Sequence, residues 1–319
     1  MQTNNRKLLT AAGALILCGA VLFIITMGRS KWDFNAMSTI KMVSKEYEFN
    51  EKIQSISIDA DTTDITFRAS DTDRCRIEVY EDEKMPHRVK VDDGKLSIRP
   101  EDQRKWYEHI VFFSFGSPKL TVYLPAKAYT ALRIDLSTGD VVIPDDFSFG
   151  EIDITTSTGD VSCEASSDGR LKIGCDTGNI DLKGIKASDL MLSVSTGHIY
   201  VTDAKVKKSI TFHVSTGKSK LTDVTCENIT SEGSTGDADM ENVIASGTVK
   251  IKRSTGHVKL EKCDAYELFI KTSTGKVSGS FLTDKVFITS SDTGKIDVPK
   301  TISGGRCEIT TDTGNIIFK

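Results

Sequence analysis

The stretch Leu-Arg-Ile-Asp-Leu-Ser-Thr-Gly-Asp-Val-Val-Ile, residues 132–143, contains the pattern that decides the fold. Leu132, Ile134 and Leu136 alternate with polar residues before the tripeptide Ser-Thr-Gly, and Val141 and Ile143 resume the alternation after it. Alternation with a period of two predicts half-buried β-strands. The stretch therefore predicts two short strands that meet at a glycine corner.

The same corner recurs throughout the C-terminal half of the chain. Ser-Thr-Gly or Asp-Thr-Gly occurs ten times, and successive copies are 19 or 20 residues apart. The ten glycines are Gly139, Gly159, Gly178, Gly197, Gly217, Gly236, Gly256, Gly275, Gly294 and Gly314. A fixed period of this length is typical of a solenoid, in which each repeat forms one coil.

Apolar residues recur at the same positions of each repeat, seven and five residues before the glycine and two and four residues after it. Examples are the pairs Ile152/Ile154, Leu171/Ile173, Leu190/Leu192 and Val249/Ile251 before the glycine and Ile180/Leu182 and Ile199/Val201 after it. We also expect inward positions at Val286 and Ile288, and a third inward position at Ile185, Ala204, Val224, Val243 and Leu282.

One such repeat is too small to bury its own apolar face, so it must stack on its neighbours. The sequence thus predicts an all-β protein, a parallel right-handed β-solenoid of coils of about 19–20 residues. At the corners, glycine allows a positive φ, and the Ser or Asp two residues earlier is expected to bond to the backbone and hold the turn. The alternative is that the stacked hydroxyl groups form a binding array.

An apolar segment precedes the repeats. Residues 8–27 contain no charged residue and, as a helix, would span about 30 Å, the thickness of a bilayer core. We expect an uncleaved transmembrane helix, because the apolar stretch is longer than that of a signal peptide. A cleaved signal peptide and a lipid-modified Cys18 are the alternatives. The short N-terminal tail favours a cytoplasmic N-terminus and an extracytoplasmic bulk.

These expectations divide the chain into five parts. We predict a cytoplasmic tail at 1–7, a transmembrane helix at 8–27, a juxtamembrane spacer at 28–50, a degenerate first coil with an N-terminal cap at 51–131, and ten solenoid coils at 132–319. In the first coil, Thr63 occupies the place of the corner glycine. The cap contains the most aromatic part of the chain, and a candidate binding surface there comprises Trp106, Tyr107, Phe112, Phe113 and Phe115.

The last predicted coil ends only a few residues after Gly314, with nothing left to cover it. An unpaired strand edge invites pairing with another chain. We therefore expect the protein to form a homo-oligomer through its C-terminal coil.

Composition and motifs argue against several functions. The chain has 41 Lys and Arg against 45 Asp and Glu, so it lacks the basic footprint of a nucleic-acid-binding protein. Its seven cysteines include one in the apolar segment, and most of the others fall on inward positions, where cysteine acts as a small buried apolar residue. We expect no enzyme, no cofactor and no metal site, because no nucleophile–base pair and no group of metal ligands stands at a suitable spacing.

The serial Ser-Thr-Gly motifs, together with the strand at 120–124 that ends at Pro125, resemble the putative-adhesin family of bacterial, membrane-anchored β-strand-repeat proteins. The resemblance covers about residues 53–319. It implies a β-solenoid with a role at the cell surface or in envelope stress, and it supplies no catalytic residues.

Taken together, these patterns favour a non-catalytic, single-pass plasma-membrane protein whose extracytoplasmic solenoid binds a cell-wall glycan or a surface protein. A self-assembling scaffold and an accessory protein of an envelope-stress response are the alternatives.

Overall fold

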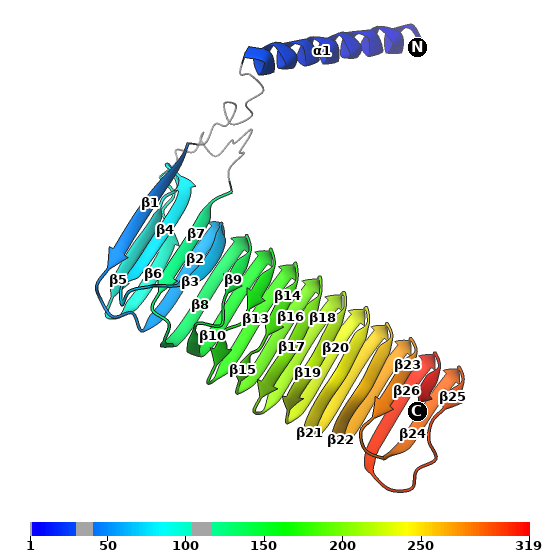
Figure 1. Cartoon of the computed structure of the whole chain (residues 1–319). Helices are drawn as coiled ribbons and strands as arrows, with labels where there is room; N and C mark the ends of the chain where they lie inside the picture. Colours follow the sequence, from blue (N-terminus) through cyan, green and yellow to red (C-terminus); the bar gives the residue numbers. More distant parts are fainter. Residues whose placement is uncertain (1, 30–40, 104–116) are drawn as a thin grey trace.

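The computed structural model describes residues 2–29, 41–103 and 117–319, and its side-chain detail begins at residue 10 and omits residue 11. One helix, α1 (Gln2–Arg29), comes first, and the elements described after it are all β-strands (Figure 1). Among the described residues, α1 contains the one segment that is long and apolar enough to cross a membrane, Ala12–Arg29.

The solenoid has a first face of stacked parallel strands, which lead into the glycine corners. Its strands, in stacking order, are β2 (Ser55–Thr62), β8 (Ala128–Thr138), β10 (Ser148–Thr158), β13 (Arg170–Thr177), β16 (Asp189–Thr196), β18 (Ser209–Thr216), β20 (Asn228–Thr235), the second halves of β21 (Ala238–Thr255) and β22 (Val258–Thr274), β26 (Gly305–Thr313) and β24 (Lys285–Thr293).

A second face follows the corners. It stacks β3 (Asp64–Ala69), β9 (Val141–Ile143), β11 (Val161–Cys163), β14 (Ile180–Lys183), β17 (Ile199–Val206), β19 (Ser219–Cys226), the first halves of β21 and β22, β23 (Val277–Phe281), β27 (Ile316–Phe318) and β25 (Ile296–Asp297). The short strands β12 (Ser166–Ser167) and β15 (Lys186–Ala187) lie on a third face, to which the ends of β17 and β19 and the middle parts of β21 and β22 also contribute.

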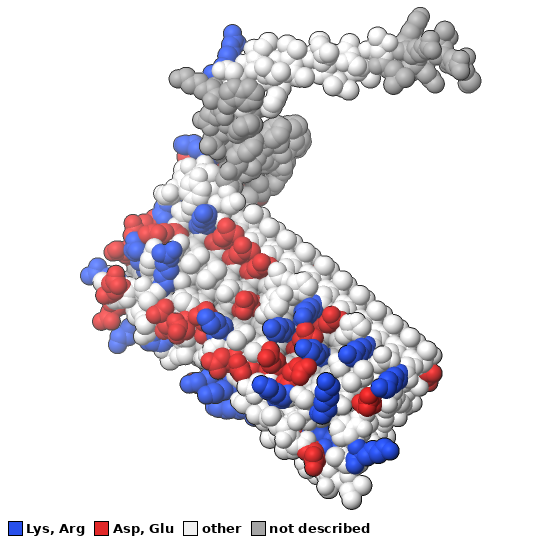
Figure 2. Space-filling model, turned by 45° about the vertical axis from the view of Figure 1, so that its right-hand side comes forward, with Lys and Arg blue, Asp and Glu red and all other residues white. Residues whose placement is uncertain are grey.

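Equivalent residues of successive coils stand directly beside one another. Leu132 pairs with Ile152, and Ile152 with Leu171, so that one column of buried apolar side chains continues along the rod. Most apolar positions before and after the glycines, and four of the five residues predicted at the third inward position, are buried as predicted. This confirms the parallel β-solenoid. Charged side chains of both signs are interspersed on its outside (Figure 2).

The corners require glycine because the coils approach so closely there. Gly159 has φ of 135°, and a Cβ on it would lie 2.0 Å from the carbonyl oxygen of Gly139 in the coil before. The N–H of Gly139 donates to the carbonyl oxygen of Thr158 at 2.9 Å. The threonines before the glycines are stacked in register along the whole array, as predicted.

The predicted bond from Ser to the corner backbone is not found among the described hydrogen bonds. Where the residue after the glycine is Asp, Asn or His, its side chain accepts a backbone N–H of the neighbouring coil instead. Asp140 Oδ1 accepts from the N–H of Asp160 at 2.8 Å, and His198 Nδ1 accepts from the N–H of Lys218 at 2.9 Å. The sequence prediction was wrong because the parallel stack brings the next coil's N–H closer than the residue's own turn.

The N-terminal end of the rod is closed by antiparallel strands. β1 (Met42–Phe49) pairs with β4 (Cys75–Asp82), and β4 pairs with β7 (Lys119–Leu124), which extends the second face. The hairpin of β5 (His87–Asp92) and β6 (Lys95–Pro100) extends the first face. In the first coil, formed by β2 and β3, Thr63 occupies the corner beside Gly139. The predicted spacer at 28–50 was too long, since β1 belongs to the cap.

The far end of the rod differs from the prediction. The chain passes from β23 to the outermost strands β24 and β25, then returns, and β26 and β27 insert between these strands and the preceding coil. The C-terminal strands are therefore internal, and the exposed edge belongs to β24 and β25. The prediction of an open C-terminal coil was wrong because the 20-residue spacing does not record the stacking order.

Two inward predictions near this end were also wrong. Phe287 stands opposite the buried Cys307, so its neighbour Ile288 faces outward and is 49% exposed. Three apolar residues in a row, Val286 to Ile288, leave the phase of the alternation undefined. Leu282 is 54% exposed, because Phe281 takes the inward position opposite Cys263.

Candidate binding site at the coil crossover

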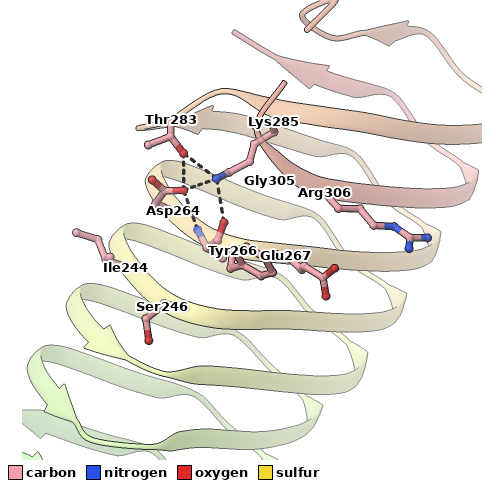
Figure 3. Close-up of a pocket in the computed structure, with 12 residues that line it drawn as sticks. Ile244, Ser246, Asp264, Tyr266, Glu267, Thr283, Lys285, Gly305 and Arg306 are labelled. Atoms are coloured by element: carbon pink, nitrogen blue, oxygen red, sulfur yellow. Dashed lines mark hydrogen bonds and ion pairs between the residues drawn. The ribbon is translucent and has the colours of Figure 1, made fainter. Parts of the chain in front are cut away.

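The crossover interrupts the third face and leaves a cavity of about 590 Å³ on the side of the rod (Figure 3). In the coils before it, each strand of this face is covered by the next coil. After β23 the chain turns away towards β24, so that the middle of β22, around Ala265, has no strand beside it on this side. The cavity is lined by Ile244, Ser246, Asp264, Tyr266, Glu267, Thr283, Lys285, Arg306 and the small residues Ala245, Ala265, Gly304 and Gly305.

Lys285 seals the inner wall of this crossover pocket. Its side chain is only 3% exposed, and its ammonium group donates to Asp264 Oδ1 at 2.5 Å, to Thr283 Oγ1 at 2.8 Å and to the carbonyl oxygen of Ala265 at 2.9 Å. A backbone N–H of the next coil would otherwise bond to that carbonyl. Lys285 therefore replaces a missing strand, and its buried charge is balanced by Asp264 and by two further acceptors.

Two glycines allow the returning chain to pass. Gly304 has φ of 120°, and a Cβ on it would lie 2.0 Å from the carbonyl oxygen of Asp284. A Cβ on Gly305 would lie 2.5 Å from the carbonyl oxygen of Tyr266. The floor of the pocket is thus packed backbone against backbone, which makes it a rigid surface.

The outer wall of the pocket consists of exposed side chains, among them the aromatic ring of Tyr266. Tyr266 is 71% exposed and Ile244, on the neighbouring strand, is 40% exposed. Glu267 and Arg306 stand opposite each other on adjacent strands at the rim. The Arg306 guanidinium lies 5.4 Å from the centre of the Phe269 ring and donates to Glu308 at 2.5 Å. The pocket thus combines an aromatic surface, a small apolar patch and charged groups at its edge.

This arrangement suits binding better than bond-breaking chemistry. The acid nearest the floor, Asp264, is committed to Lys285, and no nucleophile with an adjacent free base lines the pocket. Over the described residues, no group of three or more His, Cys, Asp or Glu side chains is placed to hold a metal ion. Concave sites of a few hundred Å³ are typical of small-ligand binding.

The other residues singled out from the sequence have structural positions. The ten corner glycines form one row along the rod, as predicted. His198 and His257 both accept backbone hydrogen bonds, from Lys218 and Lys276. The aromatic candidates Trp106, Tyr107, Phe112, Phe113 and Phe115 lie outside the described residues, so this binding surface stays a prediction.

The cysteines after the helix are free and buried in the described structure. Burial raises the pKa of the Cys163 and Cys307 thiols to about 12 and that of Cys263 to about 11. A thiol with so high a pKa is almost entirely protonated at neutral pH and is a poor nucleophile. Their position agrees with the prediction that they act as small apolar residues.

Sequence reasoning missed the crossover pocket. The repeat spacing continues through it without a break, so periodicity gives no sign of the altered stacking. One signal was present: Gly304-Gly305 is the only pair of adjacent glycines in the chain. Such a pair indicates close backbone approaches at that point.

Stacked parallel coils, a capped N-terminal end and glycine corners define a toastrack-type β-solenoid. The chain belongs to the Toastrack DUF4097 family, whose model matches residues 53–212. This confirms the family resemblance that the repeats indicated. A comparison with curated proteins finds no match.

Several solved structures are similar to this chain. A "putative lipid binding protein" from Parabacteroides distasonis ATCC 8503 is 17% identical, with a TM-score of 0.48 over 88% of this chain and 98% of that one. A "putative adhesin" from the same organism is 13% identical, with a TM-score of 0.47 over 88% and 98% of the two chains. Another "putative adhesin", from Parabacteroides merdae ATCC 43184, is 14% identical, with a TM-score of 0.47 over 88% and 98%.

Proposed function

We propose that this protein is a non-catalytic, membrane-anchored binding protein whose extracytoplasmic rod holds a cell-surface glycan in the crossover pocket. The observation that carries the proposal is the exposed Tyr266 ring on the wall of a rigid pocket with charged groups at its rim. A sugar ring has one apolar face and a rim of hydroxyl groups. Tyr266 suits the apolar face, and Ser246, Glu267 and Arg306 suit the hydroxyls.

The exposure of Tyr266 is itself an argument for a ligand. A tyrosine exposed to this degree leaves most of its apolar ring in water, and burying such a ring is favourable by roughly 25 cal/mol per Å². The ring is attached to a strand of the solenoid and not to a loop, so little conformational entropy is lost when a ligand covers it.

The proposed membrane anchor is helix α1. It supplies the apolar length of a bilayer span, and Arg29 stands in its last turn. With a cell-surface glycan as the ligand, the rod lies on the extracytoplasmic side of the membrane.

Two measurements test the proposal. A protease site engineered between residues 30 and 40 should release the repeat array from intact cells, and retention of the repeat array would contradict the extracytoplasmic position.

The second measurement tests the ligand. The full-length protein in nanodiscs should bind one or more of the surface glycans printed on a glycan array. Tyr266→Ala should weaken that binding at least tenfold. Tyr80→Ala, on the cap, is the matched control, since Tyr80 is also partly exposed but lies far from the pocket. Equal loss in both variants would contradict the site.

A scaffold function is the second candidate, and the open edge of β24 and β25 favours it. Ile288 on β24 and Ile296 on β25 are both exposed there, at 49% and 41%. The other end carries the charged strands β1 and β5, which discourage edge pairing. Association through one end only would give a dimer and not a filament. Sedimentation of Ile288→Lys against the unaltered protein tests this: a monomer for both would remove the scaffold.

A further inference from the structure

We infer that the third face of the rod binds an extended acidic polysaccharide, which runs from a group of lysines on the middle coils to the crossover pocket. The inference rests on the proposed function and names its ligand class. It depends on a separate set of residues, Lys186, Lys205 and Lys207, here called the lysine ridge.

The register of the strands places the ridge and the pocket on one straight track. Lys186 pairs with Lys205, Lys205 with Thr225, Thr225 with Ile244, and Ile244 with Asp264. The first two residues belong to the ridge and the last two line the crossover pocket. Four spacings between neighbouring strands give a track of about 19 Å.

The ridge has its own hollow. A cavity of about 230 Å³ is lined by Lys186, Lys205 and Lys207, with the small residues Ser167, Ala187 and Val206 between them and Asp168 at one side. The three lysine side chains are exposed. In the described part of the chain, none of them forms an ion pair, although other lysines of the rod do, such as Lys172 with Asp153 and Lys218 with Asp239.

Lys186 and Lys205 repel each other. Like charges directly opposite on adjacent strands destabilise a sheet. Other lysines of the rod stand opposite an acidic residue, as Lys172 does at Asp153, while Lys252 and Lys271 on the first face form a second like-charged pair. An anionic ligand would supply the missing counter-charge.

The shape of the track selects a linear polymer. On the track, Thr225 stands between the ridge and Ile244 of the pocket, and no long charged side chain of the track separates the two. Acidic groups of the polymer would contact the lysines, while an uncharged face of one of its sugar rings would cover Tyr266. A single strand of nucleic acid would need several aromatic rings for its bases. Apart from Tyr266, neither cavity is lined by an aromatic side chain.

The test measures binding of polygalacturonate oligomers to the full-length protein in nanodiscs. The triple variant Lys186→Gln, Lys205→Gln, Lys207→Gln should lose at least tenfold in affinity and most of the salt dependence. The control is Lys250→Gln, Lys252→Gln, Lys271→Gln, which makes the same charge change on the first face and should lose less than twofold. An oligomer too short to span the track should bind more weakly than a long one.

Each other outcome overturns the inference. Equal loss in the two triple variants would mean non-specific attraction. An affinity that does not depend on oligomer length would contradict the claim that the polymer extends from the ridge to the pocket. Binding of polyphosphate but not of polygalacturonate would mean the wrong polymer. Binding of a neutral glycan that depends on Tyr266 and not on the ridge would leave the proposed function intact and overturn only this inference.

Discussion

Arg253 lies inside the solenoid directly opposite Gly233, its pairing partner on the adjacent coil. Its side chain is buried, and its Nη2 donates to the hydroxyl groups of Ser219 and Ser231, both at 2.8 Å. A Cβ on Gly233 would lie 3.2 Å from the Arg253 guanidinium carbon and 2.6 Å from the carbonyl oxygen of Val214. Burial lowers the pKa of Arg253 to about 10. Because Gly233 has no side chain, the buried guanidinium group of Arg253 on the adjacent coil has room beside it.

This relationship predicts the effect of Gly233→Ala. The added methyl group meets backbone on one side and the guanidinium on the other, so we expect a loss of about 1–3 kcal/mol of unfolding free energy. Urea unfolding measures it. Gly174→Ala is the control, because its Cβ would approach only the Ser193 hydroxyl, at 3.2 Å. A smaller loss for Gly233→Ala than for Gly174→Ala would contradict the packing.

The corner glycines should be far less tolerant than the glycine of the second corner. A Cβ on Gly197 would lie 1.9 Å from the carbonyl oxygen of Gly178, so Gly197→Ala should cost at least about 3 kcal/mol or prevent folding. Gly184 also has a positive φ but has open space around it, and Asp203 and Asp223 occupy the equivalent place in later coils. Gly184→Asp should therefore stay within about 1 kcal/mol. Thermal unfolding of the two variants measures the loss of stability in each. Similar losses for Gly197→Ala and Gly184→Asp would contradict the stacking argument.

The row of side-chain acceptors after the glycines predicts that asparagine can replace histidine. His198→Asn should keep the bond to the N–H of Lys218, since Asn179 makes the same bond to His198 at 3.0 Å. His198→Leu should lose about 1 kcal/mol. His213 faces outward beside Ser215 and accepts no backbone N–H in the described structure. His213→Asn and His213→Leu should therefore differ little. The midpoints of urea unfolding measure the difference between the Asn and Leu variants at each position. An equal difference at positions 198 and 213 would contradict the prediction.

The cap contains a pH-dependent contact at Glu81. Burial alone would raise the pKa of this carboxyl, but hydrogen bonds from His87 at 2.8 Å and from Lys45 at 2.9 Å outweigh it and hold the pKa below its ordinary value. A lowered pKa in the folded state adds stability above the unfolded-state pKa, and this stability is lost as the pH falls through the folded-state value.

We therefore expect the stability advantage of the unaltered protein over Glu81→Gln to shrink as the pH falls from about 6 to about 3. Unfolding by urea across this range measures the difference. Glu83→Gln is the control, because Glu83 is an exposed partner of Lys41. An advantage over Glu81→Gln that is independent of pH would contradict the assignment.

The altered stacking order at the far end predicts an unusual pattern of hydrogen exchange. The N–H of Ile316, in the C-terminal strand β27, donates to the carbonyl oxygen of Lys295 and should exchange slowly, although it lies three residues from the chain end. Amides of β25 should exchange faster, since this strand is the outermost of its face. The reverse order would mean that the coils stack in simple sequence order.

Much of the architecture follows from sequence alone, as single residues show. Leu132, Ile152 and Leu171 are spaced by the repeat and fall into one column, because a period of two fixes which side of a strand is buried. The corner glycines were predictable for the same reason, since every copy stands at the same step of the coil. Thr63 could be recognised as a corner without glycine because the apolar frame around it is intact.

The candidate site did not follow from the sequence. Tyr266 stands among outward residues with nothing to mark it, and Lys285 is a lysine like many others on the surface. Whether they meet depends on the order in which the last coils stack, and Gly294 and Gly314 have the same spacing whichever coil is outermost. The lysine ridge also depends on the tertiary structure. Lys186 and Lys205 are 19 residues apart in the sequence, and the register of the parallel strands brings them together.

The sequence by itself determined the coil, the corner and the interior, because these depend on local alternation and on the steric demands of glycine. The tertiary structure alone decided the order of the last two coils and the pocket that results from it. Every coil offers its neighbour nearly the same edge of N–H and carbonyl groups, so local preference cannot choose the partner. Long-range packing, with Lys285 in place of a missing strand, makes that choice.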